Sequence, residues 1–446
     1  MMKKCKNDVT KNTCDFVNNE NLFLVSIFIF SFIIRLVAIF YLKHYLNPLV
    51  WENGGIADNI LAGKGFSIGF LGPEGPTSWQ APFYPYLLAF FYAFMGKGYL
   101  TYLCIEILQS LIMSLIPVFL YKSAKIIFNP EVAILTAIVS SLFPLTIWYA
   151  TRIHHTAFTF FFISLAFYLF LKSFEAENKK YFILVGFVVG LGVLIEPVII
   201  MLFLAFSVWA GIQRGFLYSI KKNTIPLLII ILIISPWTFR NYRIHGKLIF
   251  IKSSFGKEFW MGNNPHATGT SFAEGGNDEI TNVYPPVIYD ELKKYPELTR
   301  NKLLQNEALQ WIRNNPLDFI SLILKKVLYF WWYPPDNLVR HSGEGEAIKY
   351  ALIKKLYWGG MLILFLYGII QGVKNKNKYV MLMLLICIFH SMVYILTHVG
   401  QMRFRGVIEP IILIYVMYGA LCLWVWCKSK IMEPILLYKN ESSNIS

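Results

Sequence analysis

Residues 181–212 read YFILVGFVVGLGVLIEPVIIMLFLAFSVWAGI, and this stretch decides how the chain must fold. Apolar residues dominate it, and at about 1.5 Å per residue a single helix of this length would be far longer than the roughly 30 Å hydrocarbon core of a bilayer. Basic residues flank it on both sides, with Lys179 and Lys180 before it and Arg214 after it. Because basic flanks favour the cytoplasmic side, the stretch should cross a membrane twice, breaking at Pro197.

The composition supports a membrane protein throughout. Of the 446 residues, 56% are hydrophobic and 15% are charged, with a mean hydropathy of +0.51. A soluble protein carries about 25% charged residues, so a soluble globular fold is excluded. The net charge of +15 does not indicate nucleic-acid binding, because Lys and Arg occur in small groups between apolar segments rather than on one surface. These groups are signals of membrane orientation.

Ten membrane crossings account for the charge pattern. Two lie in 181–212, and the others are predicted at 22–42, 100–121, 131–149, 153–171, 224–239, 351–371, 379–398 and 406–427. With ten crossings, all of the short basic loops and both termini lie on the cytoplasmic side. We therefore expect a multi-pass protein of the cell membrane, the bacterial inner or plasma membrane, with both termini cytoplasmic.

The remaining polar sequence lies on the outer face. We expect a first external loop at 43–99, in which 83–96 is a juxtamembrane helix, and a large extracytoplasmic domain at 240–350 with an interfacial helix at 317–333. The predicted fold is an all-α polytopic membrane protein with a mixed extracytoplasmic loop domain. Its parts are a cytoplasmic tail at 1–21, a transmembrane module at 22–239, the outer domain at 240–350, C-terminal transmembrane helices at 351–427 and a second cytoplasmic tail at 428–446.

Four sequence blocks in this outer region carry a family resemblance. The first external loop contains WENGGIADNILAGKGFS at 51–67 and GPTSWQAPFYPYLLA at 75–89. The others are SPWTFRNYRIHG at 235–246, FWMGNNPHATG at 259–269 and RFRGVIEP at 403–410. In this order, the blocks resemble those of GT-C glycosyltransferases, a superfamily that includes protein O-mannosyltransferases and bacterial aminoarabinose transferases.

The resemblance implies a specific reaction. A GT-C enzyme takes a sugar from a polyprenyl-phosphate-linked donor and transfers it, with inversion, to a lipid, glycan or protein acceptor outside the membrane. The chain departs from the family pattern at three places: Glu52 lies about one helical turn after the usual acidic position, His154 and His155 stand where relatives often have an acid, and Glu196 replaces an arginine. In agreement with a lipid-linked donor, the sequence contains no Walker loop, dinucleotide-binding fingerprint or Asp-x-Asp motif for a nucleotide sugar.

Glu52 is our candidate for the general base, because sugar transfer to a hydroxyl needs a group that takes its proton. The simpler interpretation is a solvated loop acid beside Trp51. For the departing phosphate we select two arginine pairs at outer helix ends, because guanidinium binds phosphate in bidentate fashion. These are Arg240 with Arg243 and Arg403 with Arg405; membrane anchoring is the alternative for each pair.

Further polar residues are candidates for binding the sugar. His154 and His155 could bind substrate or be ordinary interfacial histidines, and Trp260 with Asn263 and Asn264 combines an aromatic face with amide hydrogen bonds, or forms an ordinary capped loop. Glu106 is an ionisable residue within a crossing, which we interpret as part of a structural pair. No cofactor is expected, and the sequence leaves a divalent metal open.

Two other functions are compatible with the sequence. A lipid-sugar flippase or solute transporter would also be polytopic, but transporters commonly show related halves, and this chain has its polar mass on one side. A non-catalytic scaffold with the GT-C fold is the other alternative, favoured by the missing early acid. The expected partners are the lipid-linked donor, the acceptor and membrane lipids.

Overall fold

The computed structural model describes residues 20–69, 72–274, 279–280, 291–335, 338 and 346–443. The transmembrane bundle contains α2 (Glu20–Leu42), α5 (Tyr99–Met113), α6 (Ile116–Ile127), α7 (Pro130–Ser141), α8 (Pro144–Ala150), α9 (Thr156–Ala176), α10 (Lys179–Val193), α11 (Ile200–Arg214), α12 (Phe216–His245), α18 (Glu346–Lys374), α19 (Tyr379–Thr397) and α21 (Glu409–Ser443). The protein is an all-α polytopic membrane protein, as predicted.

The expected break in the long apolar stretch is present. Helix α10 ends at Val193, the short 3-10 helix η2 (Pro197–Ile199) follows, and α11 begins at Ile200. In the described part of the chain, eight helices are long and apolar enough to cross a membrane, or nine when the bent pair α7 and α8 counts as one crossing. Helix α10, in the first half of the predicted double crossing, has 15 residues and is not among these helices.

The crossing predicted at 131–149 consists of two helices that are bent relative to each other. Helix α7 ends at Ser141 and α8 begins at Pro144, with a bend of 45° between them. Proline at the first position of a helix fits there because its missing N–H would have no acceptor, whereas inside a continuous helix it would remove a hydrogen bond. The bend directs the chain after α8 toward one end of the bundle.

Helix α9 forms the centre of the bundle. In its 18-residue apolar segment, 78% of the residues are buried, whereas only 22% are buried in the corresponding segments of α2 and α12. Helices α2 and α12 therefore present most of their surface outward. Apolar side chains that point outward are expected for lipid-facing helices. Helix α9 packs against α6 and α10, and α21 packs against α18 and α7.

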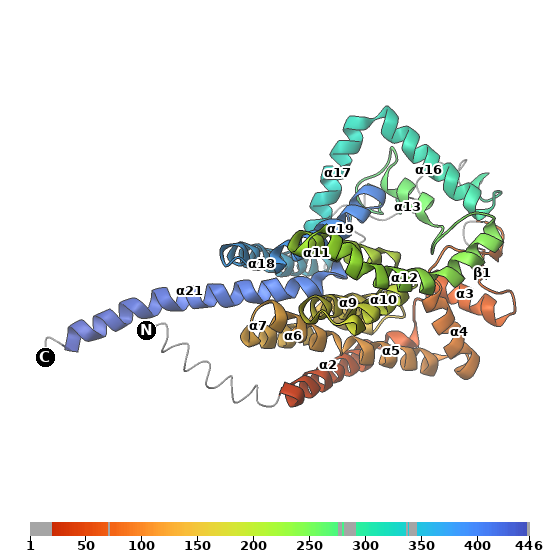
Figure 1. Ribbon diagram of the computed structural model, residues 1–446. Helices are drawn as coiled ribbons and strands as arrows, with labels where there is room; N and C mark the ends of the chain where they lie inside the picture. The colour runs from red at the N-terminus through yellow and green to blue at the C-terminus, as the bar shows by residue number, and fades with distance from the viewer. Residues whose placement is uncertain are drawn as a thin grey trace.

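The elements outside the bundle gather away from the start of α2 and the end of α21. In Figure 1, α2 begins and α21 ends toward the left, whereas α3 (Trp51–Leu61) and α4 (Phe83–Met95) lie at the right. Two short antiparallel strands, β1 (Ser67–Ile68) and β2 (Gly75–Pro76), connect these helices. Helices α13 (Phe255–Gly262), α16 (Glu297–Asn314) and α17 (Pro316–Trp331) lie above the bundle (Figure 1), and the short α20 (Met402–Gly406) precedes α21.

Candidate functional site

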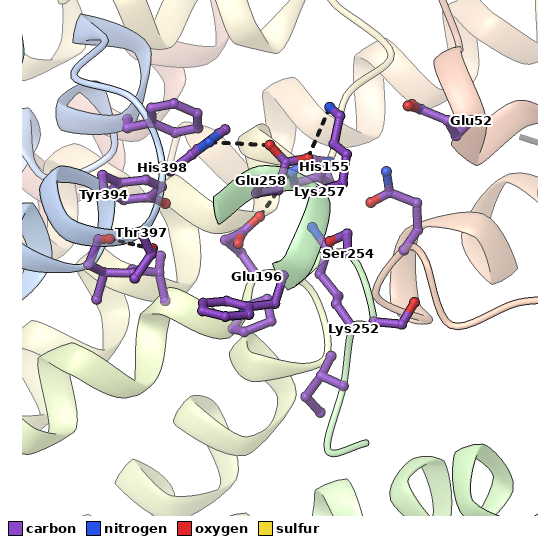
Figure 2. A pocket seen from close by; sticks show the side chains of 18 of the residues that line it. Glu52, His155, Glu196, Lys252, Ser254, Lys257, Glu258, Tyr394, Thr397 and His398 are labelled. Atoms are coloured by element: carbon purple, nitrogen blue, oxygen red, sulfur yellow. Dashed lines mark hydrogen bonds and ion pairs between the residues drawn. The ribbon is translucent and has the colours of Figure 1, made fainter. Parts of the chain in front are cut away.

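A cavity of about 1710 Å³ lies between the outer helices and the end of the bundle. Its wall is formed by the start of α3, the α8–α9 loop, the turn between α10 and α11, the segment 247–258, one side of α16 and the end of α19 with the loop that follows. Figure 2 shows its charged side chains pointing toward one another. Segments far apart in the sequence therefore build one polar chamber.

Polar side chains of neighbouring elements hold the α8–α9 loop, which carries His154 and His155. His44, in the 3-10 helix η1 (His44–Leu46), contacts the carbonyl and the hydroxyl of Thr151 through Nδ1 at 3.0 and 3.1 Å. Gln109 on α5 donates to the carbonyl of Arg152 at 2.6 Å. Buried backbone carbonyls outside regular structure need such donors, so these contacts hold the loop in one conformation.

The two adjacent histidines have different hydrogen-bond partners. His155 Nε2 lies 3.3 Å from Glu196 Oε2. His154 Nδ1 accepts the backbone N–H of Thr156 at 3.2 Å, so its Nε2 carries the proton when the ring is neutral. Burial lowers the pKa of His154 well below its ordinary value, and the positive charges of His155, Arg403 and Lys252 lower it further. His154 is therefore a neutral hydrogen-bond donor at physiological pH.

Two carboxylates of the cavity are ionised. Burial raises the pKa of Glu196, but the charge of Lys252 and the hydrogen bond with His155 outweigh burial and hold that pKa at about 2. Burial also raises the pKa of Glu258, and His398, Lys257 and Lys252 lower it to a value below the ordinary one. Glu258 Oε2 lies 3.2 Å from His398 Nδ1. Figure 2 marks this pair with a dashed line. Lysines and histidines of the chamber thus stabilise the ionised form of both carboxylates.

Four of the predicted site residues line this cavity: Glu52, His154, His155 and Arg403. Glu52 stands in the first turn of α3, and Arg403 stacks over the ring of Phe404 at 4.7 Å. The structure therefore brings together the candidate base, the histidine pair and one of the four predicted arginines.

Arg240 and Arg405 are bound to other parts of the protein. Arg240 donates to the carbonyls of Thr77 and Phe66 and stacks over Trp237 at 4.6 Å. Arg405 is 2% exposed, pairs with Glu409 at 2.8 Å and lies 3.5 Å above the ring of Trp358. These contacts favour structural roles over phosphate binding. Arg243 is exposed and does not line the cavity.

The predicted sugar-binding group at the end of α13 faces the protein interior. Trp260, Asn263 and Asn264 are at most 2% exposed, and none of them lines the cavity. Asn263 Oδ1 accepts from the buried Lys326 at 2.9 Å, and Asn264 donates to the carbonyl of Trp260 at 2.9 Å. These contacts fit the alternative of a capped loop.

Residues 79–239 match the family model described as dolichyl-phosphate-mannose-protein mannosyltransferase. An oligosaccharyltransferase of Archaeoglobus fulgidus, tethered with an acceptor peptide, has a TM-score of 0.52 and 16% identity over 89% of this chain and 49% of its own. The same enzyme, AglB, in complex with an inhibitory peptide and a dolichol-phosphate, has a TM-score of 0.52 and 15% identity over 94% and 51%. The chain has the GT-C fold.

The chain spans about half the length of the oligosaccharyltransferases that it matches. ArnT from Cupriavidus metallidurans, bound to undecaprenyl phosphate, is similar over 89% of this chain and 77% of its own, with 12% identity and a TM-score of 0.41. No curated protein matches the chain in sequence.

Sequence reasoning missed several residues of this cavity. Lys252, Ser254, Lys257, Glu258 and His398 all line it, although they lie outside the motifs that suggested the family. The available signal was the polar stretch 252–258 directly between two of those motifs. The pairing of His155 with Glu196 joins two departures from the GT-C pattern that are far apart in the sequence. No group of three or more metal-binding side chains occurs among the residues that the structure describes.

Proposed function

We propose that this protein is a membrane glycosyltransferase that moves a sugar from a polyprenyl-phosphate-linked donor to an acceptor hydroxyl on the outer face of the membrane, with inversion at the anomeric carbon. The single observation that carries the proposal is the cavity itself, where Glu52 faces the same chamber as several cationic side chains. The family match to a dolichyl-phosphate-mannose enzyme and the dolichol-phosphate complex of AglB support a lipid-linked donor.

Glu52 is the proposed general base. Within the described part of the chain, Glu52 has no ion pair, whereas Glu196 and Glu258 each have a histidine partner. The acceptor hydroxyl gives its proton to Glu52 while its oxygen forms a bond to the anomeric carbon. The bond between that carbon and the phosphate oxygen breaks, and its electron pair leaves with the polyprenyl phosphate. Cations of the cavity stabilise the charge that develops on the departing phosphate.

Sugar release from defined donors tests this function. The full chain is reconstituted in proteoliposomes and supplied with polyprenyl phosphates that carry radiolabelled mannose, glucose, N-acetylglucosamine or aminoarabinose, together with a membrane extract as a source of acceptors. We expect one of these donors to lose its sugar, with polyprenyl phosphate as the second product. Movement of intact donor between leaflets without loss of sugar would overturn the proposal in favour of a flippase. Inertness toward all four donors would favour a scaffold.

A further inference from the structure

The beginning of helix α13 lines the cavity. The segment Lys252–Glu258 contributes to its wall together with Met261, while Gly256 packs against the backbone of Asn301 and Gly262 against the backbone of His398. The first N–H groups of a helix have no partners within the helix, and the helix dipole makes this end positive. The positive end of α13 therefore points into the cavity.

The free N–H groups of α13 are only partly used. Lys257 N–H donates to Asn301 Oδ1 at 3.0 Å, and Glu258 N–H donates to the carbonyl of Ser254 at 3.1 Å. In the part of the chain that the structure describes, no protein acceptor receives the N–H groups of Phe255 and Gly256. Two backbone donors thus remain for a ligand at this helix end.

A serine in the cavity wall points to the same ligand. Ser254, directly before α13, is 6% exposed. It lines the cavity, and Figure 2 shows it among the lining side chains. Among the described residues, no hydrogen bond of the Ser254 hydroxyl is present, and this oxygen is not sealed off from the cavity. A ligand oxygen in the cavity can accept its hydrogen bond.

Two lysines supply the matching charge. Lys252 and Lys257 stand before and after Ser254, and both line the cavity (Figure 2). Lys257 Nζ lies 3.3 Å from Glu258 Oε1, and Lys252 lowers the pKa of both Glu196 and Glu258. His155 and His398 lie 3.3 and 3.2 Å from these two carboxylates, so each carboxylate has a histidine beside it as well as a lysine nearby.

We propose that Lys252, Ser254, Lys257 and the first N–H groups of α13 form a binding site for a phosphate group, and that this is the phosphate of the lipid-linked donor. The assignment of the lipid as its source rests on the proposed function, while the phosphate site itself does not. Backbone N–H groups at a helix start, a hydroxyl and ammonium groups are the donors that phosphate sites commonly combine. These groups take the phosphate-binding role that the sequence had suggested for Arg240 and Arg405. The guanidinium groups of both arginines bind other parts of the protein.

Equilibrium binding to the purified full-length chain in nanodiscs tests the site. The probes are undecaprenyl phosphate, undecaprenol and inorganic phosphate, and the variants are Lys252→Ala, Lys257→Ala and Ser254→Ala. Lys302→Ala, on α16 at the same cavity, is the control for general charge. We expect undecaprenyl phosphate to bind, undecaprenol to bind much more weakly, each lysine variant to lose at least about tenfold in affinity, and the control to change little.

The outcomes separate the site from the proposed function. Equal binding of undecaprenol, or lysine variants that bind like the wild type, would overturn the phosphate site, as would a control variant that loses as much affinity as they do. Inorganic phosphate that binds as tightly as the lipid, with the same dependence on the lysines, would support the site and overturn the lipid as its source. Lysine-dependent lipid binding in a protein that transfers no sugar would leave the site intact and reject the transferase.

Discussion

Glu52 can be separated from an ordinary surface acid by one substitution. In Glu52→Gln the side chain keeps its size and its hydrogen bonding but cannot accept a proton, so we expect turnover to fall on the order of a hundredfold or more with donor binding unchanged. Asp58 on the same helix is the matched control, because it pairs with Lys97 at 2.5 Å on the exposed side. Asp58→Asn should leave turnover nearly unchanged, since exposed pairs contribute about 0–1 kcal/mol. A Gln variant that keeps more than about a third of wild-type turnover would remove Glu52 as the base.

Arg240 connects helix α12 to the first external loop, so its loss should destabilise the protein. Its guanidinium bonds to the carbonyls of Phe66 and Thr77 and to Asn241 Oδ1. We expect Arg240→Ala to lower the free energy of unfolding by roughly 1.5–3 kcal/mol, and Lys to rescue little because it lacks the planar fork. Thermal unfolding in detergent measures the effect, with the exposed Arg243→Ala as control. Weaker donor binding at unchanged stability would restore the earlier prediction of a phosphate ligand.

For single residues, the sequence predicts which side chains can bind a substrate better than it predicts where those side chains point. Glu52, His154, His155 and Arg403 were selected by residue type at outer helix ends, and they do line the cavity. Arg405 and Asn263 were selected by the same reasoning, yet they face buried partners. Composition shows that a side chain can bind phosphate or sugar, whereas its orientation depends on contacts with segments distant in the sequence.

The bent helix pair depends on an arginine inside the membrane. Arg35 on α2 is fully buried and donates to Thr146 Oγ1 on α8 at 2.9 Å and to the carbonyl of Ser141, where α7 ends, at 3.4 Å. Arg35→Met should leave this carbonyl without its donor and cost roughly 1–3 kcal/mol of stability. Thermal unfolding is again the measurement, and the exposed Lys43→Met is the control. Equal melting temperatures in the two variants would show that the bend is maintained without Arg35.

The contact between α13 and the end of α19 should make stability depend on pH. Burial lowers the pKa of His398 from 6.5 to about 4, although Glu258 acts in the opposite direction. The unfolded chain therefore takes up a proton first as the pH falls, and stability should decrease between about pH 6.5 and pH 4, by at most about 1.4 kcal/mol per pH unit. In His398→Asn the decrease should be smaller over this interval. Parallel curves of melting temperature against pH for variant and wild type would contradict this assignment.

The elements themselves were largely predictable. Apolar runs bounded by basic residues located the long helices, and the length of 181–212 required the break that the structure has before α11. The bend after α7 was missed although Pro144 marks it, because the run 131–149 is apolar enough to suggest one straight helix. Hydropathy records burial in lipid, and it does not record the direction of a helix axis.

At the scale of the molecule, the fold follows from the sequence and the cavity does not. A bundle of apolar helices with its polar mass at one end is required by composition and by the charge of the loops. The cavity wall, however, takes residues from segments as distant as Glu52 and Arg403, and its pairs join residues such as Glu258 and His398. Such pairs arise from the packing of α13 against the bundle, which no local pattern in the sequence encodes.

The distribution of basic residues along the whole chain predicts its orientation in the membrane. The start of α2 and the end of α21 lie at the same end of the bundle, away from α3 and α4 (Figure 1), and Lys374 and Lys378 flank the α18–α19 turn. Because short basic loops remain in the cytoplasm, this turn should be cytoplasmic and the cavity external. Single cysteines at Asn375 and Lys294 in a cysteine-free background, treated with an impermeant maleimide in intact cells, test the orientation. We expect labelling at Lys294 and none at Asn375 until the membrane is permeabilised; labelling of Asn375 in intact cells would invert the topology and place the proposed transfer on the cytoplasmic side.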